Sequence, residues 1–240
     1  NTIYDSNLTI NGRKQGISVD GSATDANGLL TLDLGHITDG FNQHGLVKVS
    51  GVSYVLATPF DDVIKAGGDL RSMRGYGGND LLIGDSRTNT SSYRGASNAV
   101  VIQLASGLAG DSPGAGTSVG SDSLRGVEYI EGSNFNDSFD ASGFSRVSEN
   151  AGSFGWQGLT NWYEPGGGND TVIGNGLTRL VFDDAMLPMV ADYSEGYADA
   201  LNVSDRQSGS FEYLYTLGRT TFTGVVDVSG TDFGDAIVGG

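Results

Sequence analysis

The chain has 240 residues, a net charge of −16 and no cysteine, and 39 of its residues are glycine. The absence of cysteine excludes a disulfide scaffold and a thiolate metal site. The negative charge argues against nucleic acid or an anionic membrane surface as a partner, because both would repel the chain, whereas cationic partners would be attracted.

Aspartate dominates the acidic residues, since only six of the 29 acids are glutamate. Aspartate is the short carboxylate that turns use in oxygen-rich metal sites, so the composition favours Ca²⁺ as a ligand. The sequence contains no stretch of 18 apolar residues and no signal-peptide pattern. It therefore predicts no membrane span.

A block of 14 residues recurs three times along the chain without a gap. The copies read GVSYVLATPFDDVI at 51–64, GVEYIEGSNFNDSF at 126–139 and GVVDVSGTDFGDAI at 224–237. All three share Gly, Val, an apolar fifth residue, Thr or Ser, Phe, Asp and an apolar last residue. Such agreement indicates a structural repeat.

Strand signals precede each block, as apolar residues in partial alternation at 30–34, 100–104 and 201–203. They divide the chain into three predicted modules, at 1–92, 93–181 and 182–240. The connecting segments are rich in Gly, Ser, Asn and Asp, and no apolar period of helical length is present. The sequence therefore predicts an all-β fold of strands and turns.

Two glycine-rich segments follow the first two blocks: GYGGNDLLI at 75–83 and PGGGNDTVI at 165–173. They resemble the nonapeptide GGxGxDxUx, with U a large apolar residue, of the RTX or haemolysin-type calcium-binding repeat family. The resemblance implies a parallel β-roll, a solenoid in which two nonapeptides form one 18-residue coil with calcium-binding turns and irregular loop insertions. It also implies type I secretion and a place outside the cell or on the bacterial surface.

The family register can be applied from Asp62, which lies 18 residues before Asp80. With Asp62 at position six, Ile64, Met73 and Leu82 fall at the inward apolar position. Asp62 and Asp80 would then flank one Ca²⁺, with the carbonyls near 77–78 as further ligands. On the other face position six holds Arg71 and Asn89, so calcium is expected on one side only. The alternative is that these residues only form solvated turns.

Asp137 and Asp170 are 33 residues apart, which is one coil plus 15 residues lying within 141–164. The sequence predicts that this excess loops out and that the two aspartates still meet. The coil partner of Asp235 would lie beyond Gly240, which suggests a repeat unit of something longer. The candidate metal ligands are Asp61, Asp62, Gly77, Gly78, Asn79, Asp80, Asn136, Asp137, Gly167, Gly168, Asn169, Asp170 and Asp235.

Catalytic patterns are missing from the sequence. His36 and His44 are the only histidines, and there is no HExxH or GxSxG motif, so we expect surface histidines and no enzyme. The dense aromatic cluster of the looped segment could stack on sugar rings, but capping of a thin core is the favoured interpretation. The possible glycan contacts are Trp156, Trp162 and Tyr163.

The sequence thus predicts a non-catalytic, Ca²⁺-binding structural or adhesive segment of a large secreted or cell-surface protein. Its folding would be coupled to Ca²⁺ outside the cell, because a strongly acidic chain repels itself until cations neutralise it. Neighbouring copies or modules and a surface polysaccharide are the further partners considered. The alternatives are a carbohydrate-binding module and an accessory calcium-repeat module of a secreted polysaccharide-modifying enzyme.

Overall fold

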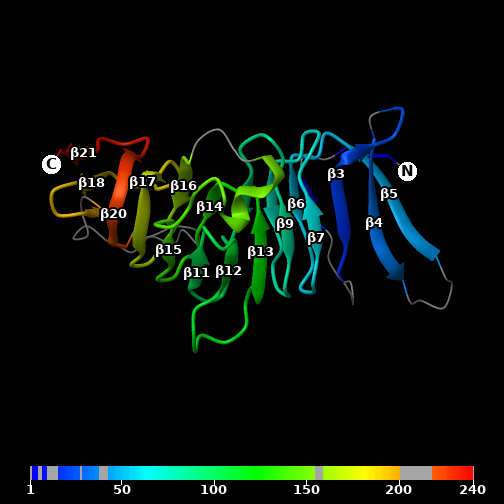
Figure 1. The fold of residues 1–240 in the computed structure, drawn as a ribbon, viewed down its shortest axis with the longest axis horizontal. Coiled ribbons are helices and arrows are strands. Elements are labelled where there is room, and N and C mark those ends of the chain that lie inside the picture. The colour runs from blue at the N-terminus through cyan, green and yellow to red at the C-terminus, as the bar shows by residue number, and fades with distance from the viewer. Residues whose placement is uncertain are drawn as a thin grey trace.

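A computed structural model describes residues 2–4, 7–9, 16–27, 29–37, 43–154, 159–200 and 218–239. Its strands form one curled, mostly parallel sheet, so the prediction of an all-β, roll-like fold is confirmed. The strands lie across the long axis of the molecule, and the two ends of the chain lie at opposite ends of that axis (Figure 1).

The strands are short and follow the turn-rich sequence. In the first predicted module they are β1 (Thr2–Tyr4), β2 (Asn7–Thr9), β3 (Ser18–Thr24), β4 (Leu30–Ile37), β5 (Gln43–Ser50), β6 (Tyr54–Leu56), β7 (Val63–Lys65), β8 (Ser72–Arg74), β9 (Leu81–Ile83) and β10 (Thr90–Ser92). In the second they are β11 (Val100–Gln103), β12 (Leu108–Asp111), β13 (Ser121–Arg125), β14 (Tyr129–Glu131), β15 (Ser138–Asp140), β16 (Asn161–Glu164) and β17 (Thr171–Val181). In the third they are β18 (Met189–Asp192), β19 (Tyr197–Ala200), β20 (Thr220–Ser229) and β21 (Ala236–Val238).

Within the described ranges the one helical element is the 3₁₀-helix η1 (Glu149–Phe154). It lies in the segment that was expected to loop out between Asp137 and Asp170. No helix among the described residues has the length and apolar character needed to cross a membrane.

The strand pairing repeats three times, in step with the sequence block. Each repeat contains an antiparallel three-stranded meander: β3–β4–β5, β11–β12–β13 and β18–β19–β20. The first strand of each meander also pairs in parallel with the strand that ends the block, as β3–β7, β11–β15 and β18–β21. The sheet continues across residues 92 and 181, because β10 pairs with β14 and β17 with β20.

The meanders are the main departure from a simple roll of 18-residue coils. Two of them turn at a glycine with positive φ, Gly107 at 64° and Gly196 at 69°. The Gly107 amide donates to the Leu104 carbonyl, and the Gly196 amide donates to the Asp192 carbonyl. The alternating signal at 30–34 lies in β4 and that at 100–104 begins in β11, whereas 201–203 lies outside the described residues.

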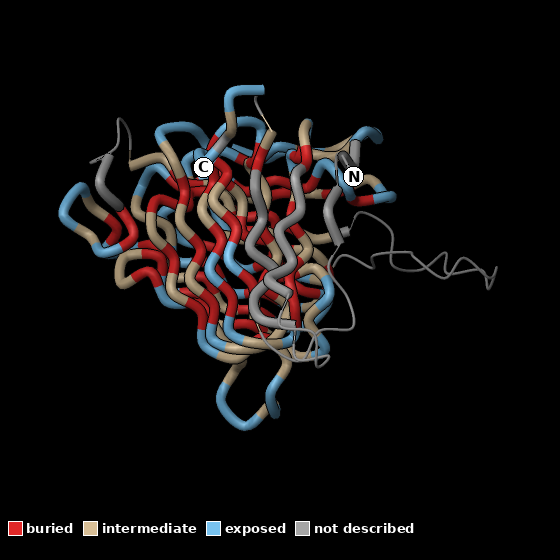
Figure 2. The backbone as a smooth tube through the Cα atoms, turned by 90° about the vertical axis from the view of Figure 1, so that its right-hand side faces the viewer, coloured by how far each residue is buried: buried red, intermediate tan, exposed pale blue. Residues whose placement is uncertain are grey.

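A continuous apolar core runs inside the roll. Ile64, Met73 and Leu82 are completely buried, which confirms the inward register predicted from Asp62. Ile64 pairs with Leu82 across β7 and β9, and Met73 with Val55 across β8 and β6, so the apolar residues stack from coil to coil. Buried residues lie along the strands that enclose the interior of the roll, while exposed residues occupy mainly the turns (Figure 2). A thin core is thus extended along the axis by repetition.

Candidate functional site

The aspartate of each repeated block joins two segments of the chain. Asp62 is 1% exposed and accepts hydrogen bonds from the amide of Ile17, just before β3, at 2.5 Å and from the amide of Thr58 at 2.8 Å. The Thr58 hydroxyl donates to the same carboxylate at 2.9 Å and accepts from the Phe60 amide at 3.2 Å. This arrangement explains why the block requires Ser or Thr four residues before Asp.

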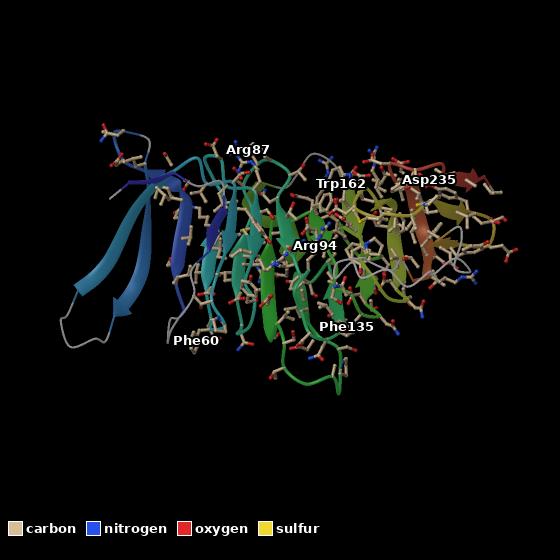
Figure 3. All side chains as sticks on the ribbon, turned by 180° about the vertical axis from the view of Figure 1, so that it is seen from behind. Phe60, Arg87, Arg94, Phe135, Trp162 and Asp235 are labelled. Atoms are coloured by element: carbon tan, nitrogen blue, oxygen red, sulfur yellow. The ribbon has the colours of Figure 1, made fainter. Side chains whose placement is uncertain are left out.

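The same bonds recur in the other two blocks. The equivalent residues are Val100, Ser133, Phe135 and Asp137 in the second block, and Met189, Thr231, Phe233 and Asp235 in the third. The phenylalanine lies at the tip of the turn: Phe60 and Phe135 are on the same edge of the roll (Figure 3), and Phe135 is 42% exposed. The sequence showed the repeated Ser or Thr, but not its bond to the aspartate.

Buried carboxylates form an inner ladder that runs from the first module into the second. The amide of Asp62 donates to Oδ1 of Asp80 at 2.8 Å, so residues 18 apart lie on neighbouring coils. The amide of Asp80 in turn donates to Oδ1 of Asp122 at 3.0 Å, and the Tyr93 hydroxyl donates to Oδ2 of Asp122 at 3.1 Å. Asp122 was missed by sequence reasoning because the β11–β12 excursion separates it from Asp80. Its one signal was an apolar residue two positions later, as after Asp62 and Asp80.

The second module repeats this contact across the looped segment. The amide of Asp137 donates to Oδ1 of Asp170 at 2.8 Å, so the two residues meet despite the 33 residues between them. Both side chains are 2% exposed. The insertion at 141–160 therefore leaves the stacking of the two turns intact.

A second ladder lies on the outside of the turns. The amide of Asn79 donates to Oδ1 of Asp61 at 2.7 Å, and the amide of Ser121 donates to Oδ1 of Asn79 at 3.0 Å. The ladder recurs from the second module into the third: the amide of Asn169 donates to Oδ1 of Asn136 at 2.8 Å, and the amide of Arg219 donates to Oδ1 of Asn169 at 2.9 Å. In four of the predicted ligands, therefore, a side-chain oxygen accepts a hydrogen bond from a backbone amide of the next coil.

Two carboxylate oxygens of the inner ladder have no hydrogen-bond partner among the residues that the structure describes. They are Oδ2 of Asp80 and Oδ2 of Asp170, and both are buried. Burial raises the pKa of Asp80, and the negative charges of Asp122 and Asp62 raise it further. Burial raises the pKa of Asp170 to about 8, with the charge of Asp137 adding to the shift. These two side chains therefore favour a proton or a cation over an uncompensated charge.

Burial raises the pKa of Asp122 too, so the inner ladder from Asp62 to Asp122 carries adjacent acids that resist simultaneous ionisation. In the part of the chain that the structure describes, no three His, Cys, Asp or Glu side chains lie close enough together to hold one metal ion. A cation at Asp80 or Asp170 would have to draw further oxygen ligands from backbone carbonyls or water.

Glycines in the predicted calcium turns allow neighbouring coils to approach closely. Gly78 and Gly168 have φ values of 107° and 99°, and a Cβ on either would collide with the backbone of the preceding turn, at Phe60 and Phe135 respectively. The Gly167 amide donates to the Ser133 carbonyl at 3.1 Å, and Gly77 lies against the Ser118 carbonyl. These positions thus have a packing role that is independent of any ion.

We expect Gly78→Ala to lower the melting temperature by about 5–10 °C, because it combines positive-φ strain with a backbone collision. Gly176→Ala is the matched control, since Gly176 has a φ of 84° but no atom within 4 Å of the position that a Cβ would occupy. Circular dichroism melting of both variants measures the difference. Equal losses would show that φ alone, and not coil packing, requires glycine at Gly78.

The predicted glycan contacts lie in different environments. Trp162 is partly exposed and its ring stacks with that of Tyr129 on the next strand, with centroids 6.5 Å apart. Tyr163 points the other way, is completely buried and stacks on Phe139 at 4.7 Å, so its ring is not accessible to a sugar. The burial of Tyr163 agrees with the interpretation that this aromatic segment caps the core. Trp156 lies outside the described residues.

An ionic cluster centres on Arg94 (Figure 3). Arg94 forms ion pairs with Glu131 at 3.3 Å and with Glu164 and Asp184. The Tyr129 hydroxyl donates to the other oxygen of Glu164 at 3.0 Å. Arg94 therefore links the loop after β10 to β14, β16 and the turn after β17. The three acidic side chains around it are all paired with its guanidinium group.

Comparison of the sequence with known families and curated proteins assigns no family to the chain. No protein-family model matches the chain, and no curated protein matches it.

Proposed function

We propose that the chain is a non-catalytic structural or adhesive segment of a large protein that acts outside the cell, and that Ca²⁺ binds its carboxylate-lined turns. The observation that carries the proposal is the unpartnered, buried Oδ2 of Asp80 and of Asp170, each one coil away from another buried aspartate. The RTX-like pattern GGND occurs at both places.

The chemistry of these positions supports a hard cation. Asp80 and Asp170 each use Oδ1 as the acceptor of a backbone amide, which leaves Oδ2 to ligate an ion. A bound Ca²⁺ would compensate the charge that burial disfavours. Asp62 and Asp137 would hold the turn in place through their amides, while the outer ladder of Asp61, Asn79, Asn136 and Asn169 fixes the spacing of the coils.

The extended architecture supports a structural role. Repeated coils give the chain length along one axis, and the core is assembled from short strands that each contact only neighbouring coils. The accessory-module alternative shares this architecture and is distinguished only by a neighbouring catalytic domain. A carbohydrate-binding role has less support, because Tyr163 is buried and Trp162 is stacked on Tyr129.

Isothermal titration with Ca²⁺ at pH 8 tests the proposal. We expect binding in the micromolar to millimolar range that Asp80→Asn and Asp170→Asn each weaken at least tenfold, and little heat with Mg²⁺, which retains its waters and requires octahedral geometry. Asp232→Asn removes the same charge at an exposed position and should leave binding unchanged. A chain that binds no Ca²⁺ at 10 mM, or variants that bind as the parent does, would contradict the calcium assignment.

A further inference from the structure

A pocket on the outer face of the first module surrounds an arginine without a counter-ion. Arg74, the last residue of β8, is partly exposed, and no acid of the described residues pairs with it. Its Nη2 donates to Oγ of Ser92 at 2.9 Å, while its Nε is buried and has no partner in the described part of the chain. By contrast, an acid pairs with each of Arg71, Arg87, Arg94, Arg125, Arg179 and Arg219. In a chain with a net charge of −16, an arginine left without an acid indicates a place for an external anion.

Two tyrosine rings hold the Arg74 side chain without neutralising it. Its Cζ lies 5.7 Å from the ring centroid of Tyr54 and 5.8 Å from that of Tyr76. Glu131, on the neighbouring part of this face, is paired with Arg94 instead. The pocket encloses about 240 Å³ up to its open mouth, which suits a ligand smaller than a drug molecule. Besides Arg74 and Tyr76, its lining residues are Ser92, Tyr93, Gly95, Ala96, Ser118 and Val119.

The backbone at Tyr76 is strained. Its φ is 71°, and among the described residues it is the one non-glycine residue with a positive φ. Counted back from Asp80 and Asp170, the equivalent residue of the second module is Gly166, whose φ is 78°. Glycine adopts this conformation freely, whereas tyrosine does not. A strained side chain that lies against the guanidinium therefore points to a role for its ring in binding.

The second module contains the same pocket with different charges. By the same count, Glu164 takes the place of Arg74. The turns at 93–96 and 182–185 also correspond, because in each the amide of the fourth residue donates to the carbonyl of the first, at 3.0 and 2.9 Å. Asp184 therefore takes the place of Gly95.

In the second module the charged groups of this pocket neutralise each other. Glu164 and Asp184 line it, and both pair with Arg94. In the first module neither position carries an acid. A Cβ on Gly95 would lie 3.3 Å from Nη1 of Arg74, so a side chain there would reach the guanidinium. Glycine leaves this space to a ligand.

We propose that the pocket at Arg74 binds the carboxylate of a small organic acid, which occupies the space that the side chain of Asp184 fills beside Arg94 in the second module. The planar guanidinium matches the geometry of a carboxylate, and its Nη1 has no partner among the described residues. The rings of Tyr76 and Tyr93 offer an apolar wall to the body of the acid. The acidic surface elsewhere on the chain does not prevent binding, because salt screens charges beyond about 10 Å at 0.1 M.

The first test identifies the ligand class by NMR. A ¹⁵N-labelled chain is titrated with D-glucuronate, a sugar acid, and with N-acetyl-L-aspartate α-amide, an amino-acid carboxylate. We expect at least one of them to shift the Nε–H resonance of Arg74 saturably, whereas their uncharged analogues D-glucose and N-acetyl-L-asparagine α-amide do not. The acid that binds more tightly identifies the body that the tyrosines accept. No shift with either acid at about 50 mM would overturn the proposal.

The second test removes the charge that recognises the ligand. Arg74→Gln should weaken binding of the acid at least tenfold, as measured by the shifts of the pocket amides. Arg179→Gln is the matched control, since it removes the same charge from β17, where Arg179 already pairs with Asp227. Equal affinities of the two variants would contradict the site. Tyr76→Gly should weaken binding severalfold. If it changed only the melting temperature, the ring would have a packing role and Tyr76 would not belong to the site.

The third test supplies the carboxylate from the chain itself. Gly95→Asp copies the second module and should abolish binding of the acid, while Gly95→Asn has the same shape without the charge. Without ligand, Gly95→Asp should melt several degrees above Gly95→Asn, because its carboxylate pairs with Arg74. Equal melting temperatures would overturn the proposal, including the case in which another residue of the chain already neutralises Arg74. None of the carboxylates assigned to Ca²⁺ lines this pocket, so these outcomes are independent of the calcium proposal.

Discussion

In EDTA, raising the pH from 5 to 9 should lower the melting temperature of the chain by roughly 5–10 °C. The cause is the set of buried acids whose pKa is raised by burial: Asp170 to about 8, Glu128 to about 7, and Asp80 upward as well. Differential scanning calorimetry across this pH range gives the measurement.

The direction follows from proton linkage. In the unfolded chain an aspartate titrates near pH 3.9, so between that pH and about 8 the folded chain holds a proton on Asp170 that the unfolded chain has lost. The stability from this group is complete below pH 3.9 and is lost as the pH rises through about 8. Groups whose pKa is lowered, such as Asp85, act below pH 5 and leave this window unaffected.

Ca²⁺ should reverse the loss at high pH, because it replaces the proton as the partner of the buried carboxylates. Millimolar Ca²⁺ is expected to raise the melting temperature at pH 9 and to have little effect at pH 5. Asp170→Asn should flatten both responses, with Asp232→Asn as the charge-matched control. A melting temperature that is constant from pH 5 to 9 in EDTA would show that the buried acids hold no proton in the folded chain across this range.

The second large effect concerns the aspartate of the repeated turn. Asp137→Ala should destabilise the chain by about 3–5 kcal/mol, since it leaves the Val100 amide and both the amide and hydroxyl of Ser133 without their acceptor in a buried turn. That loss corresponds to a fall in melting temperature of roughly 10 °C. Chemical denaturation measures the free energy directly.

Asp235→Ala is the control that the chain itself provides. Asp235 accepts the same three hydrogen bonds, from the Met189 amide and from the amide and hydroxyl of Thr231, but it is only partly buried, so water can replace the carboxylate. The expected loss is about 1 kcal/mol. If Asp137→Ala and Asp235→Ala lowered the free energy of unfolding by the same amount, burial of the turn would not explain the stabilisation that Asp137 provides.

The sequence was sufficient to predict features that depend on a fixed spacing. A strict 18-residue coil places Asp62 beside Asp80 and buries Ile64, Met73 and Leu82, because each of these depends only on register. Asp137 and Asp170 could also be paired, since a loop adds length without changing the turn.

The remaining features depend on where the chain leaves the coil. The β11–β12 excursion interrupts the period, so Asp122 could not be assigned to the ladder from its distance to Asp80. The orientation of Trp162 and Tyr163 could not be predicted either. Adjacent strand residues face opposite sides of the sheet, and the sequence does not show which side is inward. Pairing of Tyr163 with Ile130 in β14 and Leu180 in β17 determines that it lies in the core.

The orientation of the strands has a mechanical consequence. Since the strands run across the long axis, the hydrogen bonds between successive coils run along it (Figure 1). Tension applied to the two ends would load these bonds along their own direction and open the roll one coil at a time, without shearing many bonds at once. Each released coil of about 18 residues adds roughly 60 Å of extended chain. Such a segment would yield stepwise under load.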